Sequence, residues 1–176
     1  MRTLRYLVLA FLFLILVTAV VGFFLPAKVH LERSIIIKSE PHKVFKVINS
    51  LSNFNHWSPW FKKDIKAKYS LSGPVAGVGS KISWIGNNNV GNGSNEIIES
   101  VENKYIKTKF LFGKSDQPAL STISLSLETE GTKVTWAFDN DFGYNVFYRY
   151  FGFWLEDMIA PDYERGLANL KIYLET

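Results

Sequence analysis

Residues 119–139 read ALSTISLSLETEGTKVTWAFD, and this stretch decides the fold. Apolar residues alternate with polar ones over positions 123–127 and again over positions 134–138. Alternation with a period of two predicts two half-buried strands. The short Glu130-Gly131 turn joins them into a hairpin, so the sheet is predicted to be antiparallel.

Upstream of the hairpin, further apolar stretches separated by Gly, Pro and Asn turns predict more strands of the same sheet. They cover residues 29–38, 66–72, 79–85, 93–101 and 105–112. Two short helices, at residues 39–49 and 51–57, separate the first strand from the second. The predicted order is therefore one strand, two short helices and six strands.

Downstream, residues 145–174 predict one long helical stretch that Pro161 interrupts. Its second half places Tyr163, Leu167 and Leu170 at helical spacing. A sheet must bury one face, and this helix is the only element long enough to cover it. The fold class is thus α+β, with an antiparallel sheet of about seven strands wrapped on a C-terminal helix.

The N-terminal segment is predicted to span a membrane. Residues 7–25 carry no charge, and as a helix they rise roughly 28 Å, close to the apolar thickness of a bilayer. The alternative is a cleaved signal peptide, whose apolar region is shorter and ends in a small-residue cleavage site. Here the run ends in Phe23-Phe24-Leu25-Pro26, so we expect an uncleaved anchor over residues 1–27 and a folded domain over residues 28–176.

Charge predicts the orientation of this anchor. Arg2 and Arg5 precede the span, whereas Lys28 and Arg33 follow it within the folded domain. The positive-inside rule places the N-terminus in the cytoplasm and the domain on the outer side of an inner, cytoplasmic membrane. Only two or three residues link the span to the first strand, so the domain is expected to lie against the lipid surface.

Composition excludes several kinds of site. The chain has no cysteine, which removes disulfides, thiolate metal sites and cysteine nucleophiles. Beyond Arg5 it carries 18 Lys and Arg against 16 Asp and Glu, a balance that does not favour nucleic acid. The histidines lack metal-ligand spacing, and no phosphate-binding or dinucleotide motif occurs, so no metal or cofactor is expected.

Short motifs occur along the chain in a distinctive order. They are Glu32-Arg33-Ser34-Ile35 with Pro41-x-x-Val44-Phe45, Trp57-Ser58-Pro59-Trp60, Gly77-x-Gly79 with Trp84 and Gly91-x-Gly93, Gly131-Thr132-x-Val134-x-Trp136, and Asp162-Tyr163-Glu164-x-Gly166-Leu167-x-x-Leu170-Lys171. In this order they resemble START-like helix-grip proteins, specifically the polyketide cyclase/dehydrase and lipid-transport (SRPBCC-type) group. The resemblance implies a curved sheet and a long helix that enclose a cavity, but this superfamily hosts binding, transport and several chemistries.

The aromatic residues of the late strands, the long helix and the second short helix are the candidate ligand-binding residues. They are Trp57, Trp60, Trp84, Phe110, Phe112, Trp136, Phe138, Phe147, Phe151, Trp154 and Met158. The hypothesis is a cavity for an apolar ligand. The alternative for each residue is ordinary core packing that leaves no cavity.

Candidate acid–base residues are few. Asp157 follows Trp154 on the long helix, and His56 precedes Trp57 near the expected cavity mouth. Either would need a bound substrate within hydrogen-bond reach, and a solvated surface position is the alternative for both. Glu96 and Glu99 are an odd number of residues apart on one strand, so they are expected on opposite faces.

Three functions stay open on this evidence. The first is a membrane-anchored binding or carrier domain for an apolar small molecule or lipid. The second is an enzyme of the cyclase or dehydratase type that uses Asp157 or His56 in the same cavity. The third is a membrane-tethered scaffold that contacts a partner protein and binds no small molecule.

Overall fold

The computed structural model describes residues 2–113 and 118–176 of the chain. Its elements are α1 (Arg2–Phe24), β1 (Lys28–Ile37), α2 (Pro41–Ile48), η1 (Leu51–Asn53), α3 (Phe54–Trp57), η2 (Phe61–Lys63), β2 (Lys68–Ser72), β3 (Lys81–Ile85), β4 (Asn92–Val101), β5 (Tyr105–Phe112), β6 (Ala119–Glu128), β7 (Gly131–Asp141) and α4 (Val146–Glu175). The order confirms the predicted α+β fold: one strand, two short α-helices, six strands and a long final helix.

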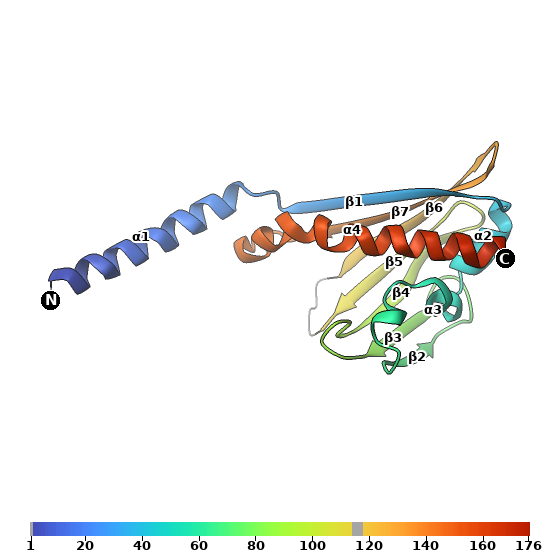
Figure 1. The fold of residues 1–176 in the computed structure, drawn as a ribbon, viewed down its shortest axis with the longest axis horizontal. Coiled ribbons are helices and arrows are strands. Elements are labelled where there is room, and N and C mark those ends of the chain that lie inside the picture. The colour runs from blue at the N-terminus through green and yellow to red at the C-terminus, as the bar shows by residue number, and fades with distance from the viewer. Residues whose placement is uncertain (1, 114–117) are drawn as a thin grey trace.

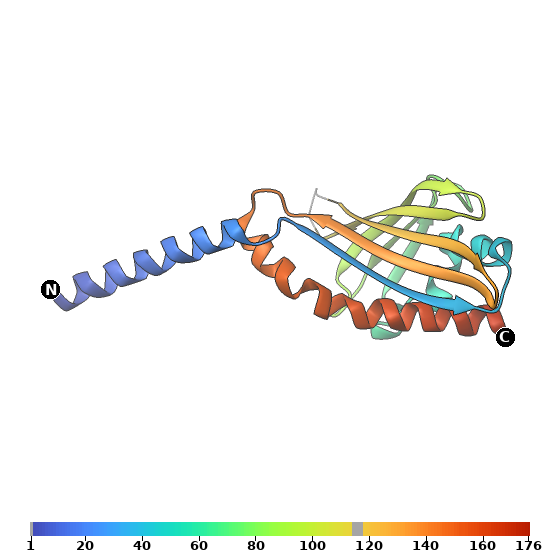
Figure 2. The same cartoon turned by 90° about the horizontal axis from the view of Figure 1, so that it is seen from above.

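Within residues 2–113 and 118–176, seven strands form one antiparallel sheet in the order β1-β7-β6-β5-β4-β3-β2. The predicted hairpin is the β6–β7 pair, whose register runs from Leu120↔Asp139 to Glu128↔Gly131. The first strand pairs with the last, from Lys28↔Asp141 to Ile37↔Thr132. The sheet curves around α4, which runs along its concave side (Figures 1 and 2).

The prediction for Glu96 and Glu99 was wrong. The ladder between β4 and β5 shifts register between Ile97 and Glu99, so a β-bulge inserts one residue there. Glu96 then pairs with Lys109, and Glu99 with Lys107, two lysines on one face of β5. Both glutamates therefore share one face of the sheet and form ion pairs with these lysines.

The prediction that Pro161 interrupts the last helix was also wrong. Helix α4 is continuous from Val146 to Glu175, with Pro161 inside it. Proline lacks the N–H that would bond to the carbonyl four residues back, which favours a bend over a break when both halves are packed. Figure 2 shows the first turns of α4 running at an angle to the rest of the helix.

The second half of α4 packs tightly on the sheet. Tyr163, Leu167 and Leu170 are buried there. The closest approach is at Gly166, where an added Cβ would lie 2.5 Å from the Trp136 ring. Only glycine lets the helix backbone approach the indole this closely.

Helix α1 extends away from the domain and is long and apolar enough to cross a membrane (Figure 1). Of residues 2–24, only Gly22 is buried. An added Cβ at Gly22 would lie 2.2 Å from Val146 Cγ1, so α1 meets the first turn of α4 at this point. Because apolar side chains face outward all around α1, this helix is not a core helix of the domain.

We predict that Gly166→Leu destabilises the domain by about 1–3 kcal/mol, because the added side chain forces α4 away from Trp136. Chemical unfolding of the detergent-solubilised chain, followed by tryptophan fluorescence, measures the change. Ala168→Leu, at an exposed position two residues later, is the matched control. Equal unfolding midpoints for the two variants would contradict the close-contact explanation.

Candidate functional site

A cavity of about 430 Å³ lies between the first half of α4 and the sheet. This volume is typical of sites that bind small molecules. The lining residues come from α4, the ends of β5, β6 and β7, and the loop after α3. They are Trp60, Phe110, Phe112, Ala119, Phe138, Asn140, Phe142, Tyr148, Phe151, Leu155, Met158, Ile159 and Tyr163.

The strand register gathers these residues at one end of the sheet. Phe110, near the end of β5, pairs with Ala119, at the start of β6. The next residue of β6 pairs with Asp139 near the end of β7. The same end of the sheet includes Lys28, where β1 begins after α1. The cavity therefore lies at the end of the domain that faces α1.

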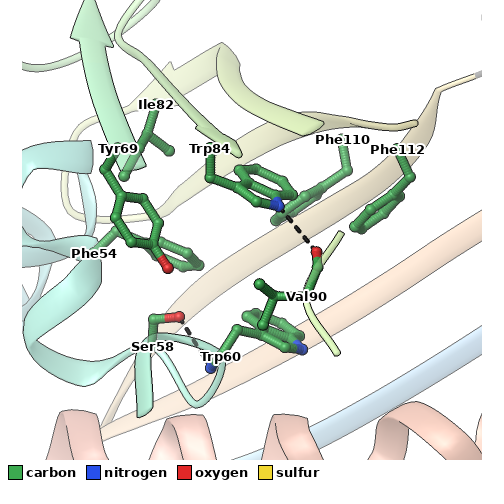
Figure 3. Close-up of a pocket in the computed structure, with 9 residues that line it drawn as sticks. All are labelled: Phe54, Ser58, Trp60, Tyr69, Ile82, Trp84, Val90, Phe110 and Phe112. Atoms are coloured by element: carbon green, nitrogen blue, oxygen red, sulfur yellow. Dashed lines mark hydrogen bonds between the residues drawn. The ribbon is translucent and has the colours of Figure 1, made fainter. Parts of the chain in front are cut away.

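A second cavity, of about 50 Å³, shares three lining residues with the first, and Figure 3 shows the residues around it. Its lining residues are Phe54, Ser58, Trp60, Tyr69, Ile82, Trp84, Val90, Phe110 and Phe112. Trp60, Phe110 and Phe112 line both cavities, so they separate the two spaces.

Trp60 is held in place from several sides. Its ring stacks on Phe54 with centroids 6.2 Å apart and meets Trp136 edge to face at 5.8 Å. Close by, Lys63 Nζ lies 2.6 Å from Oδ2 of Asp162, a nearly buried carboxylate on α4. This ion pair ties the segment that carries Trp60 to the long helix, which favours a preformed cavity wall.

The indole of Trp84 is positioned by its neighbours in the sheet. Its Nε1–H donates to the carbonyl oxygen of Val90 at 3.1 Å, as Figure 3 shows. Trp84 pairs with Gly93 on the next strand, where an added Cβ would lie 2.7 Å from the indole. The glycine thus makes room for the ring, which reaches Phe112 at 5.9 Å between centroids.

Tyr163 is the buried ionisable group of the cavity wall. Its ring stacks on Trp136 with centroids 4.2 Å apart. Burial raises the pKa of the Tyr163 phenol far above its usual value, and the negative charge of Asp139 raises it further. A hydrogen bond with the Ser121 side chain lowers this pKa, but by less than burial raises it. The phenol therefore stays protonated at neutral pH and presents a neutral polar group.

The chemistry of the lining is apolar with a few neutral polar groups. Among the described residues, neither cavity is lined by Asp, Glu, His, Lys or Arg. Hydroxyls of serine and tyrosine, the indole groups and the Asn140 amide are the polar atoms available. In the part of the chain that the structure describes, no cluster of His, Asp and Glu side chains has the geometry of a metal site. Such a lining suits an apolar, uncharged ligand.

The eleven candidate ligand-binding residues fall into three groups. Those that line a cavity are Trp60, Trp84, Phe110, Phe112, Phe138, Phe151 and Met158. Trp57 and Trp136 are buried in the core, with ring centroids 5.2 Å apart. Phe147 and Trp154 face outward on α4 and are 85% and 55% exposed.

The two candidate acid–base residues lie outside both cavities. Asp157 is exposed on α4. His56 is also exposed, and its ring stacks on Tyr173 near the C-terminal end of the helix, 5.4 Å between centroids. The structure therefore does not bring these two side chains to the cavity.

Sequence reasoning missed several lining residues, and some had a usable signal. Asn140 continues the alternation of Trp136 and Phe138 along β7. Leu155 and Ile159 follow Phe151 at steps of four on α4, and Tyr163 is one further step. Ala119 had none, because nothing in its type distinguishes a cavity wall from a filled core.

Residues 28–175 match the profile of a protein family described as "Polyketide cyclase / dehydrase and lipid transport". No curated protein sequence matches the chain significantly. The family match covers every strand and α4, and it begins at the residue where β1 begins.

Solved structures share the fold at low sequence identity. Protein CV1439 from Chromobacterium violaceum is 16% identical with a TM-score of 0.54, and the match covers 86% of this chain and 99% of that one. The protein of unknown function SA2116 from Staphylococcus aureus is 15% identical with a TM-score of 0.61, and the match covers 84% of this chain and 94% of that one. The di-domain ARO/CYC protein StfQ from the steffimycin biosynthetic pathway is 10% identical with a TM-score of 0.60, and the match covers 85% of this chain and 51% of that one. At these identities the likeness concerns the fold alone.

We predict that Tyr163 makes the domain less stable at high pH. The unfolded phenol ionises near pH 10, whereas the folded pKa is raised, so the unfolded state gains stability first. Stability is then lost as pH rises above about 10, by about 1.4 kcal/mol per pH unit until the folded pKa is reached. Free energies of unfolding at several alkaline pH values measure the slope.

In Tyr163→Phe, that part of the slope should disappear. Tyr144→Phe, which removes an exposed phenol, should keep the wild-type slope. If the two variants lose stability equally with pH, Tyr163 is not the group responsible.

Proposed function

The chain belongs to the polyketide cyclase/dehydrase and lipid-transport family, and on this premise we propose that it is a membrane-anchored domain that binds an apolar small molecule or a lipid. The proposed binding site is the 430 Å³ cavity between the sheet and the first half of α4. This cavity is the observation that carries the proposal. A scaffold that binds no ligand has no need of such a space, which leaves apolar side chains without packing partners.

The lining favours a ligand with a large apolar body and at most a few neutral polar groups. Phe138 and Leu155 form buried apolar walls, whereas Phe151 and Met158 are half-exposed at the mouth. Asn140 and the phenols of Tyr148 and Tyr163 are polar groups able to orient a hydroxyl or carbonyl of the ligand. We propose these residues as the contact set.

A cyclase or dehydratase activity has less support. Such chemistry uses a general acid or base within hydrogen-bond reach of the substrate. Among the described lining residues only tyrosines can transfer a proton, and burial keeps Tyr163 protonated. The proposed role is therefore binding, with the candidates Asp157 and His56 outside the cavity.

We further propose that α1 is the membrane anchor of this domain. A signal sequence can also form an apolar N-terminal helix, but a cleaved peptide needs no specific contact with the mature domain. Here Gly22 packs against Val146 and Tyr150 of α4. In addition, Arg149 donates hydrogen bonds to the carbonyl oxygens of Phe23 and Leu25 at the end of α1, at 2.9 and 3.4 Å. These contacts support a helix that stays attached.

We predict that Ala119→Phe reduces ligand binding, because the added ring fills the cavity from the wall formed by β6. Protein extracted from its own membranes in mild detergent should carry an apolar ligand that native mass spectrometry detects. The variant should carry at least about tenfold less, equivalent to a loss of about 1.4 kcal/mol in binding free energy.

Leu127→Phe is the matched control, since it enlarges an exposed side chain on the same strand. It should carry as much ligand as the wild type. A wild-type protein that never carries or takes up an apolar ligand would contradict the proposed function. Equal loading of the two variants would place the ligand elsewhere.

A further inference from the structure

The first half of α4 and the turn before it present aromatic side chains on the outside of the molecule. We call them the aromatic cluster: Tyr144, Phe147, Tyr148, Phe151, Phe153 and Trp154. Their exposed fractions range from 46% to 89%. An exposed apolar patch of this extent marks a surface that contacts another apolar phase.

Charge is nearly absent from this part of the helix. Between Val146 and Leu155 the only charged residue is Arg149, and it is buried. Its guanidinium is occupied by backbone carbonyls: Nε and Nη2 donate to Gly143 at 2.9 and 2.6 Å, and Nη1 donates to Phe23 at 2.9 Å. The outer surface of these ten residues is therefore uncharged, as a segment in contact with lipid requires.

A contact with α1 relates the first half of α4 to the bilayer that α1 is proposed to span. The Tyr150 hydroxyl donates to the carbonyl oxygen of Thr18 at 2.7 Å. Thr18 lies seven residues before the end of the uncharged run at Leu25, which corresponds to about 10 Å along the helix. When α1 spans a bilayer, the second turn of α4 therefore lies beside the C-terminal turns of α1, near the boundary of the apolar layer.

We propose that the aromatic cluster is a second membrane-contacting element, inserted into the lipid leaflet that surrounds the C-terminal end of α1. This inference rests on the proposed anchoring by α1, and it adds a second surface of the protein that contacts the same lipid leaflet. Tyr and Trp are well suited to such a position, because their rings combine an apolar body with a polar group.

Continuity with α1 identifies lipid as the partner. The cluster adjoins a helix whose outward apolar side chains already require lipid, and the small residue Gly22 lets the two helices meet closely. Charged side chains favour water over lipid, so those that border the aromatic cluster indicate the edge of the lipid contact. Lys28 and Asp141 lie at the end of the sheet, and the exposed Glu156 and Asp157 follow the cluster on α4.

The insertion has a consequence for the cavity. Tyr148 and Phe151 belong to the aromatic cluster and also line the 430 Å³ cavity. The mouth of the cavity then opens against the leaflet. A ligand drawn from the bilayer passes between lipid and cavity without crossing water, which favours a lipid-soluble molecule as the occupant.

Site-directed spin labelling tests the insertion in the full chain, because the sequence has no cysteine. Single cysteines replace Phe147 in the cluster, Leu127 at the β6–β7 turn and Leu12 in α1, all exposed apolar positions. The labelled proteins are reconstituted in phosphatidylcholine vesicles. Relaxation by dissolved oxygen reports lipid exposure, and relaxation by a water-soluble nickel complex reports exposure to water.

We expect oxygen to dominate at positions 12 and 147 and the nickel complex to dominate at position 127. A label at 147 that responds like the label at 127, while position 12 lies in lipid, overturns the insertion but leaves the anchor intact. A label at position 12 in water overturns the anchor and the insertion together.

The ligand-binding proposal is tested separately with Ala119→Phe added to the Phe147→Cys protein. Filling the cavity should remove the bound ligand and leave the label at 147 in lipid. A label that moves to water when the cavity is filled would show that its contact with lipid depends on the bound ligand and not on insertion of the aromatic cluster, and would overturn the insertion.

Discussion

The close contact between Gly166 and Trp136 is the constraint on which the rest of this structure depends. It sets how near α4 comes to the concave face of the sheet, and the buried residues Leu167 and Leu170 extend the contact toward the C-terminus. In the first half of α4, the opening turns run at an angle to the rest of the helix (Figure 2). The cavity lies in the space between this half of α4 and the strand ends. The tight contact thus positions the core, and the path of the first half of α4 positions the candidate site.

Much of the fold could be predicted because its signals are local. The alternation in β6 and β7 gave the hairpin, and the length of the final helix made it the only cover for the sheet. The β-bulge between Ile97 and Glu99 could not be predicted, because it depends on how β4 pairs with β5 and no residue type in this stretch indicates it. Pro161 was misjudged because tertiary packing kept the helix continuous across it.

The candidate site was harder to predict because composition does not distinguish three apolar environments. Trp57 and Trp60 are three residues apart, yet one is buried in the core and the other lines both cavities. Phe147 and Phe151 lie one helical turn apart, yet only Phe151 reaches the cavity. Core, cavity and outer surface all accept the same side chains, and only the three-dimensional path of α4 separates them. The aromatic residues named from the sequence therefore lie in more than one apolar environment.

We propose that an apolar ligand occupies the space between α4 and the strand ends, at the end of the domain nearest α1. The most direct measurement is an experimental structure of the full chain in lipid nanodiscs prepared from its host membranes. We expect continuous density for a ligand between Ala119, Phe138 and Leu155, extending toward the lipid beside Phe151. A cavity closed by movement of α4 onto the sheet, or one that contains only ordered water, would contradict it.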